Sequence, residues 1–122
     1  MKESIVQKKS FQFSLNIISL YKNLQVEKEF IISRQLLRCG TSIGANIEEA
    51  LAGQSKKDFA SKMAISSKEA RETKYWLRLL KESELSELNV DSLILEIDEL
   101  IRILTSIVKT SQLNISESKT KN

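Results

Sequence analysis

The stretch that decides the fold is residues 32–50, ISRQLLRCGTSIGANIEEA. Its apolar side chains recur at steps of four, three, four, four and three residues, which places them on one face of a helix with about 3.6 residues per turn. Gly53 follows, at a position where helices commonly end. The pattern predicts a helix over about residues 30–52 with this buried stripe: Ile32, Leu36, Cys39, Ile43, Ile47 and Ala50.

Three more segments show helical periodicity: about residues 4–25, about residues 55–82, and a last segment that has Asn89 or Asp91 as its N-cap and runs to about residue 112. Short polar stretches separate the segments, and short connections make consecutive helices antiparallel. We therefore predict an all-α protein, an antiparallel up-down-up-down four-helix bundle. It forms one domain over residues 1–113, followed by a flexible polar C-terminal tail over residues 114–122. A single long coiled coil is disfavoured because the polar breaks recur regularly.

The composition argues against an enzyme. The 122 residues include no His and one Cys, Cys39, which excludes a histidine general base, a Ser-His-Asp triad and a cysteine-cluster metal site. A Mg²⁺ or Mn²⁺ site with oxygen ligands alone, from Glu48, Glu49, Glu69 and Glu72, is the alternative. We expect no catalytic or metal-binding residues and no cofactor.

Charged side chains flank the stripes of the second and third predicted helices. An unpaired buried charge is costly, so such residues on adjacent helices should pair and fix the register of the two helices. The candidates for structural ion pairs are Arg34, Arg38, Glu49, Glu69 and Glu72.

Gly40 and Gly44 lie inside the second predicted helix, where each costs about 1 kcal/mol relative to alanine. The simplest compensation is a neighbouring helix that crosses too close for a Cβ atom.

Some apolar residues fall outside the core stripes. Scattered apolar residues on a surface need no explanation, but a large aromatic such as Trp76 on a second face is typical of an interface. We therefore expect a homo-oligomer rather than a monomer. The candidate interface residues are Ile65, Trp76, Leu79, Leu95 and Ile103.

The net charge of +3 conceals a polarity along the chain. Residues 1–81 hold 15 basic and 8 acidic side chains, whereas residues 82–117 hold 2 basic and 8 acidic ones. The last predicted helix is therefore an acidic strip on an otherwise basic subunit. Ordinary solvated charge is one explanation. Contact with the phosphates of RNA or DNA is the other, with candidate residues Lys8, Lys9, Lys22, Lys56, Lys57 and Lys62.

Two stretches resemble a known family. Residues 35–50, QLLRCGTSIGANIEEA, and residues 55–80, SKKDFASKMAISSKEARETKYWLRLL, are similar to the bacterial four-helix-bundle proteins called 23S rRNA intervening-sequence proteins. The family pattern has QLLRSGTSIGANIEEA and a later KEAxETxYWLxLL. Cys39 stands where Ser or Ala is more usual. The resemblance extends over about residues 8–110, and the first and last helices match in pattern only.

The resemblance implies a four-helix bundle assembled as a homopentameric ring. Related bundles are accessory proteins of diversity-generating retroelements that contact nucleic acid and a reverse transcriptase, so the resemblance implies partners of these two kinds. It implies no catalytic residues.

These observations favour a non-catalytic, oligomeric helical bundle that scaffolds a nucleic acid or a ribonucleoprotein. The alternative is a protein–protein interaction module that contacts no nucleic acid. No targeting signal and no membrane-spanning segment is apparent in the sequence, so we expect a cytoplasmic location without membrane contact.

Overall fold

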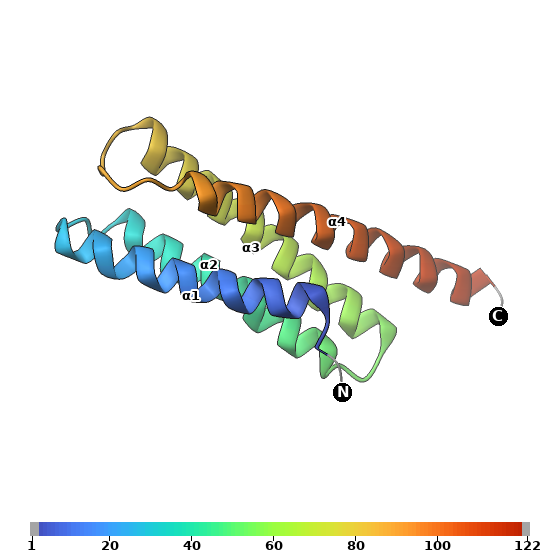
Figure 1. Ribbon diagram of the computed structural model, residues 1–122. Coiled ribbons are helices and arrows are strands. Elements are labelled where there is room, and N and C mark those ends of the chain that lie inside the picture. The colour runs from blue at the N-terminus through green and yellow to red at the C-terminus, as the bar shows by residue number, and fades with distance from the viewer. Residues whose placement is uncertain (1–2, 121–122) are drawn as a thin grey trace.

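The computed structural model describes residues 3–120, which form four α-helices and no strand (Figure 1). The helices are α1 (Ile5–Val26), α2 (Ile32–Leu51), α3 (Lys56–Glu82) and α4 (Asp91–Thr120). Each helix packs against the next along the chain, and α4 also contacts α1, which closes the bundle. The predicted all-α, up-down-up-down four-helix bundle is confirmed.

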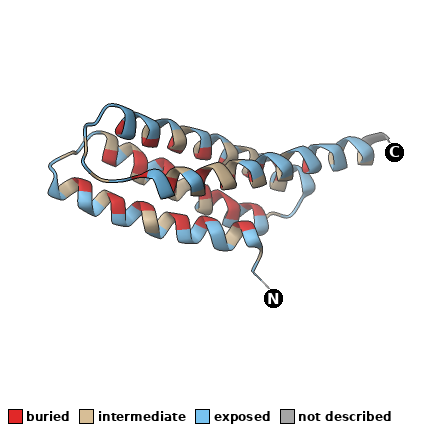
Figure 2. Cartoon of the chain, turned by 45° about the horizontal axis from the view of Figure 1, so that its top comes forward, coloured by how far each residue is buried: buried red, intermediate tan, exposed pale blue. Residues whose placement is uncertain are grey.

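The core consists of one face of each helix (Figure 2). Burying these faces removes apolar surface from water, which stabilises the fold by about 25 cal/mol per Å². In the predicted 32–50 stripe Ile32 is half-buried and the other five residues are buried. The largest fully buried side chains are Phe13, Ile17, Leu24, Leu36, Ile43, Ile47, Met63, Leu77, Leu80, Ile97, Leu100 and Leu104.

Helix α1 carries two apolar rows, and only one of them faces the core. Phe13 and Ile17 belong to the buried row, and both are fully buried. The side chains of Phe11, Leu15 and Ile18 form the second row and are 63%, 46% and 36% exposed. This helix therefore leaves an apolar stripe on the outside of the bundle.

Helix α2 begins with a carboxylate cap supplied by Glu29. Its Oε1 accepts hydrogen bonds from the backbone N–H groups of Ile31 (3.1 Å) and Ile32 (2.9 Å), and its Oε2 accepts one from Ser33 (2.7 Å). Burial raises the pKa of Glu29, but the hydrogen bonds together outweigh burial and leave the pKa below its ordinary value. The ionised carboxylate is thus favoured at the positive end of the helix dipole.

Gly53 does not have the left-handed conformation of a helix-terminating glycine. Ala52 closes α2 in a right-handed conformation, and no glycine of the chain has a positive φ. A Cβ atom on Gly53 would lie 2.5 Å from Oδ2 of Asp58 and 3.1 Å from the carbonyl oxygen of Ala50. Close packing in the α2–α3 turn therefore explains this glycine better than the predicted cap does.

Helix α4 is longer than the sequence predicted. It continues to Thr120 rather than ending near residue 112, and its last turns project beyond the neighbouring helices (Figures 1 and 2). Nζ of Lys56 donates a hydrogen bond to Oγ of Ser118 at 3.3 Å, which links this extension to the start of α3. Residues 121–122 of the expected tail lie outside the described residues, and the flexibility of the tail stays a prediction.

Candidate functional site

The glutamates considered for a metal site lie on different sides of the bundle. Glu48 accepts two hydrogen bonds from Nε2 of Gln7 on α1 (3.0 and 2.9 Å), whereas Glu69 and Glu72 contact Arg38 on α2. Within residues 3–120 no group of three or more His, Cys, Asp or Glu side chains is placed to hold a metal ion. None of the helices in this part of the chain is both long and apolar enough to span a membrane.

Arg38 is the centre of a charged cluster between α2 and α3. Its Nη1 lies 3.5 Å from Oε2 of Glu69, and its Nη2 contacts Oε2 of Glu72. Nε1 of Trp76 donates a hydrogen bond to the same oxygen of Glu72 at 3.0 Å. The Arg38 side chain is 52% exposed, so each ion pair contributes less than about 1 kcal/mol. The cluster therefore orients α2 against α3 more than it stabilises the fold.

The other two candidates for ion pairs lie apart from this cluster. Glu49 pairs with Lys62 on α3, at 3.6 Å from Oε1 to Nζ. Arg34 is exposed and has no salt bridge within the described part of the chain. Arg34 lies one helical turn before Arg38 on α2, so in the antiparallel pair it faces the part of α3 that follows Glu69 and Glu72.

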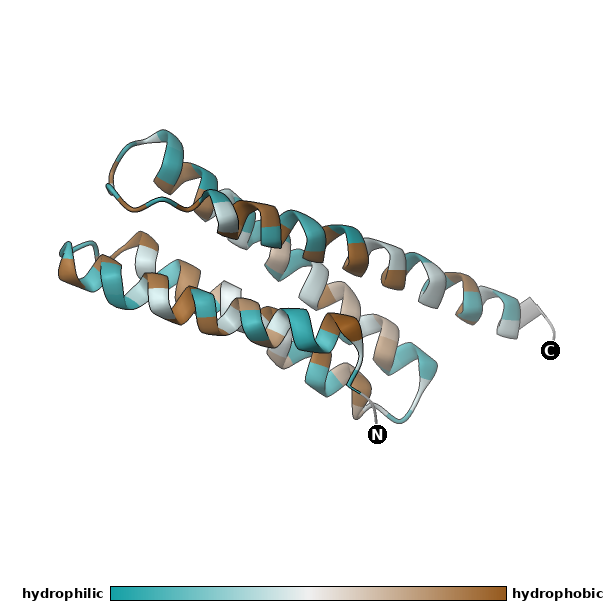
Figure 3. Ribbon diagram, in the orientation of Figure 1, coloured by the Kyte–Doolittle hydropathy of each residue, from teal (hydrophilic) through white to brown (hydrophobic). Residues whose placement is uncertain are grey.

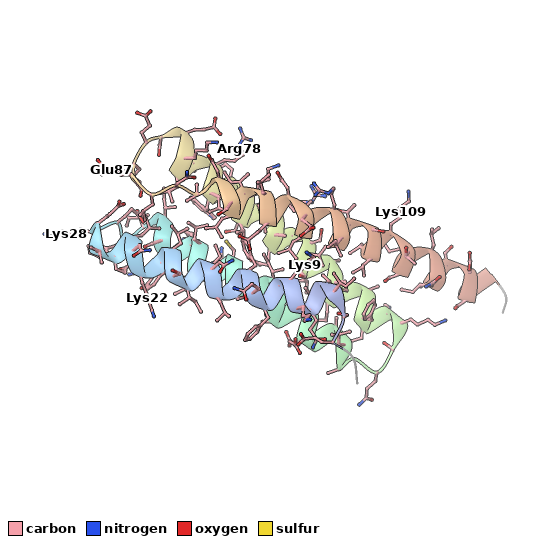
Figure 4. The ribbon with its side chains drawn as sticks, viewed as in Figure 1. Lys9, Lys22, Lys28, Arg78, Glu87 and Lys109 are labelled. Carbon is pink, nitrogen blue, oxygen red and sulfur yellow. The ribbon has the colours of Figure 1, made fainter. Side chains whose placement is uncertain are left out.

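The six candidate lysines do not form one surface. They lie on α1 and α3, which are diagonal to each other in the bundle rather than neighbours. Figure 4 shows Lys22 near the α1–α2 turn and Lys9 toward the other end of α1. Lys9 pairs with Glu99 at 2.8 Å, and Lys62 pairs with Glu49. Lys8, Lys22 and Lys57 are exposed and form no salt bridge among residues 3–120.

The acidic residues in the first half of α4 are largely paired with the neighbouring helices. Asp91 lies 2.8 Å from Lys81, Asp98 lies 2.7 Å from Lys74, and Glu99 lies 2.8 Å from Lys9. The hydrogen bond and positive charge of Lys9 hold the pKa of Glu99 below its ordinary value. The acidic strip that the sequence suggested is therefore used mainly to join α4 to α1 and α3.

Exposed cations remain along the seam between α3 and α4, and the sequence analysis missed them. We call this set the seam cations: Lys68, Arg71, Arg102 and Lys109. Nη2 of Arg71 donates a hydrogen bond to Oγ1 of Thr105 at 3.1 Å, and no seam cation forms a salt bridge within residues 3–120. Figure 4 shows Lys109 pointing away from the bundle. Lys68 and Arg71 are three residues apart and Arg102 and Lys109 are seven apart, so each pair lies on one face of its helix. This spacing is visible in the sequence, but counting charges segment by segment does not reveal it.

The candidate interface residues differ in exposure. Leu95 is 72% exposed, Ile65 is 39% and Leu79 is 37%, so these three present apolar surface to a partner. Trp76 and Ile103 are half-buried and pack against the core. The two half-buried residues therefore already contribute to the fold of one subunit.

A shallow apolar groove of about 310 Å³ lies between α1 and α2. Phe11, Leu15 and Ile18 form its α1 wall, and Gly44 and Ala45 line its α2 side. Hydrophobic residues recur along the whole of α1 (Figure 3). This groove is an apolar surface that the search for interface residues in the sequence did not identify.

These features define an all-α four-helix bundle with charged and apolar surfaces and no metal-binding cluster in residues 3–120. The family model for 23S rRNA-intervening sequence protein matches residues 2–106. The chain belongs to this family, as the resemblance indicated. No curated protein matches the chain.

A solved structure shows the same fold. It is a protein with unknown function from the S23 ribosomal protein family of Bacteroides thetaiotaomicron VPI-5482, and it is 46% identical to this chain with a TM-score of 0.82. The match covers 89% of this chain and 99% of the other chain. The last turns of α4, after residue 106, lie beyond the region that the family model matches.

Proposed function

We propose that this chain is a non-catalytic helical bundle that self-associates and binds a nucleic acid as a scaffold or accessory protein in a ribonucleoprotein. The observation that carries the proposal is the pairing of the acidic side chains of α4 with lysines on α1 and α3. Three acidic residues of α4 pair with Lys9, Lys74 and Lys81, which leaves other exposed cations, such as Lys68 and Lys109, without a salt bridge within residues 3–120. The family name refers to 23S rRNA, which makes RNA the first nucleic acid to test.

The second candidate function is a protein–protein interaction module with no nucleic-acid contact. The exposed row of Phe11, Leu15 and Ile18 beside the α1–α2 groove favours it, because exposed contiguous apolar surface commonly marks a protein interface. Self-association is common to both functions. A nucleic-acid titration therefore decides between them.

Light scattering on the purified protein should give a mass several times 13.9 kDa, and the family resemblance implies a fivefold mass. Replacing both Ile65 and Leu79 by glutamate should reduce this mass, since buried charge in an apolar interface is costly. Both side chains are more than one-third exposed, so the helical circular dichroism should be kept. Trp76→Glu is less informative because it also removes packing against the core. A monomer at micromolar concentration would contradict the assembly.

Mixed-sequence RNA and DNA should both bind in a fluorescence-anisotropy titration at low salt. The affinity should fall steeply toward physiological salt, because cations that neutralise phosphates release condensed counterions. Binding should require the assembled protein, since a subunit of net charge +3 offers few contacts. No binding at low salt by the intact oligomer would leave the protein-interaction function as the better explanation.

A further inference from the structure

We propose that the seam cations, Lys68, Arg71, Arg102 and Lys109, with the exposed ring of Tyr75, form a binding site for single-stranded RNA. This inference rests on the proposed function and assigns its site to the α3–α4 face rather than to the lysines that the sequence suggested. Nothing in the helical periodicity alone places α3 cations beside α4 cations. The antiparallel packing of the two helices does so.

Side-chain contacts along both helices set the register of α3 against α4, among them the Lys81–Asp91 pair described above. Lys74 pairs with Asp98 (2.7 Å), Arg71 bonds to Thr105 (3.1 Å), and Lys56 bonds to Ser118 (3.3 Å). In this register Lys68 lies beside the turn of α4 that contains Thr105 and Lys109, and Arg102 lies one turn from Thr105 on the other side. Four cations from two separate segments thus share one face of the bundle.

Within residues 3–120 no acidic residue forms a salt bridge with a cation of this face, although Glu99, which pairs with Lys9, also lies within electrostatic reach of Arg102. On α3, Glu69 and Glu72 turn toward α2, where both contact Arg38. On α4 the sequence has no Asp or Glu between Glu99 and Glu117. The face is bounded at one end by the Lys74–Asp98 pair. Exposed cations separated from carboxylates in this way concentrate a positive potential, which attracts a polyanion.

Hydroxyl groups and an aromatic ring complete the site. Thr105 and Ser106 are exposed on the same stretch of α4 and can donate hydrogen bonds to phosphate oxygens. Tyr75 lies one turn after Arg71 on α3, is 57% exposed, and meets Trp76 edge-on with ring centroids 5.2 Å apart. An exposed ring beside a row of cations offers a base a surface on which to stack, which a strand with unpaired bases can use and a duplex cannot.

The occupant is therefore a single strand rather than a duplex or an acidic peptide. From Lys68 to Tyr75 the helix rises about 10 Å, and Arg102 and Lys109 are also about 10 Å apart along α4. These lengths suit a strand of a few nucleotides, with phosphates along the seam and one base on the ring.

The test compares two double variants that change the charge equally. Lys68→Glu with Arg102→Glu alters the seam, and Lys8→Glu with Lys22→Glu alters two unpaired lysines on α1. Anisotropy with a fluorescent 12-nucleotide oligouridine should show at least a tenfold loss of affinity for the seam variant and less than a threefold loss for the α1 variant. Removing two phosphate contacts should also lower the magnitude of the salt slope by about 1.4. Ile65 and Leu79 of the proposed self-association surface lie within one turn of Lys68 and Tyr75 on α3. Light scattering is therefore measured on every protein, and a seam variant that changes the assembled mass would place these residues in the subunit interface and overturn the site.

Tyr75→Ala separates a single strand from other polyanions. It should weaken oligouridine binding several-fold and leave duplex RNA binding unchanged. Equal losses in the two double variants, or competition by polyglutamate as strong as by oligouridine, would overturn the seam site. If the wild-type protein binds no nucleic acid at low salt, the proposed function itself fails. If only the α1 variant loses binding, the function stands and the seam assignment is wrong.

Discussion

Replacing Ile43 or Ile97 by alanine should lower the free energy of unfolding by roughly 2–5 kcal/mol, as other large-to-small core substitutions do. Both side chains are fully buried, Ile43 on α2 and Ile97 on α4. Next to Ile43, the hydroxyl of Ser66 donates a 2.9 Å hydrogen bond to the Ile43 carbonyl oxygen, which holds α3 close to α2. Neighbours restrained in this way cannot collapse fully into the space that the lost methyl groups leave.

Urea unfolding followed by circular dichroism measures this loss, at a fixed protein concentration because self-association adds to the apparent stability. Val26→Ala is the matched control. Val26 is the last residue of α1 and is 82% exposed, so its truncation should change the free energy of unfolding by less than about 0.5 kcal/mol. A similarly small effect for Ile43 or Ile97 would mean that these residues do not belong to the core.

The core was largely predictable because it depends on a local property. A stripe of apolar residues at helical spacing must face the interior wherever the helix packs, and the stripe from Leu36 to Ala50 does so. Helix α1 marks the limit of this reasoning. Its rows through Phe11 and Phe13 are both apolar at helical spacing, and only packing against α2 and α4 decides which row is buried.

The helix ends were less predictable than the core. Glu29 lies in a short polar connection, where the sequence does not distinguish a capping carboxylate from a solvated one; only the fold brings it to three backbone N–H groups. The end of α4 was placed too early because a polar sequence lacks a strong apolar stripe. In the structure α4 continues past the neighbouring helices, and its extension has few contacts with α3, among them the Lys56–Ser118 hydrogen bond.

Surface charge was the least predictable feature because it depends on the register between helices. The count of basic and acidic residues along the chain was correct, but it assigned the acids of α4 to a separate strip. Antiparallel packing instead brings Asp98 to Lys74 and Glu99 to Lys9. A cation stays unpaired where the neighbouring helix has no acidic residue opposite it. Counting charges along the chain cannot identify such cations, because the count does not show which residues lie opposite each other.

The two glycines of α2 should respond oppositely to alanine. A Cβ atom on Gly40 would lie 2.9 Å from Cγ1 and 3.0 Å from Cγ2 of Ile17, as expected for a helix crossing too close for a side chain. Ile17 is fully buried and β-branched, so it has little freedom to rotate away. We expect Gly40→Ala to lower the free energy of unfolding by about 1–3 kcal/mol through overpacking, despite a gain in helix propensity.

Gly44→Ala is the matched control, one helical turn later. The nearest atoms to a Cβ there are the hydroxyl and carbonyl oxygens of Ser10 at 3.4 and 3.5 Å and the hydroxyl of Ser14 at 3.5 Å, which are ordinary contacts. Without a clash, alanine should raise the free energy of unfolding by up to about 1 kcal/mol, because it favours the helix. Urea unfolding of both variants at the same concentration measures the difference in sign. Equal stabilisation by both substitutions would show that α1 and α2 can separate at Gly40 without cost, and the close crossing would then not be the reason for this glycine.

Light scattering on Gly44→Ala adds a second measurement, because Gly44 lines the apolar groove beside Phe11. A subunit that is more stable but assembles to a smaller mass would mean that a partner subunit packs against α2 at Gly44, in the groove between α1 and α2.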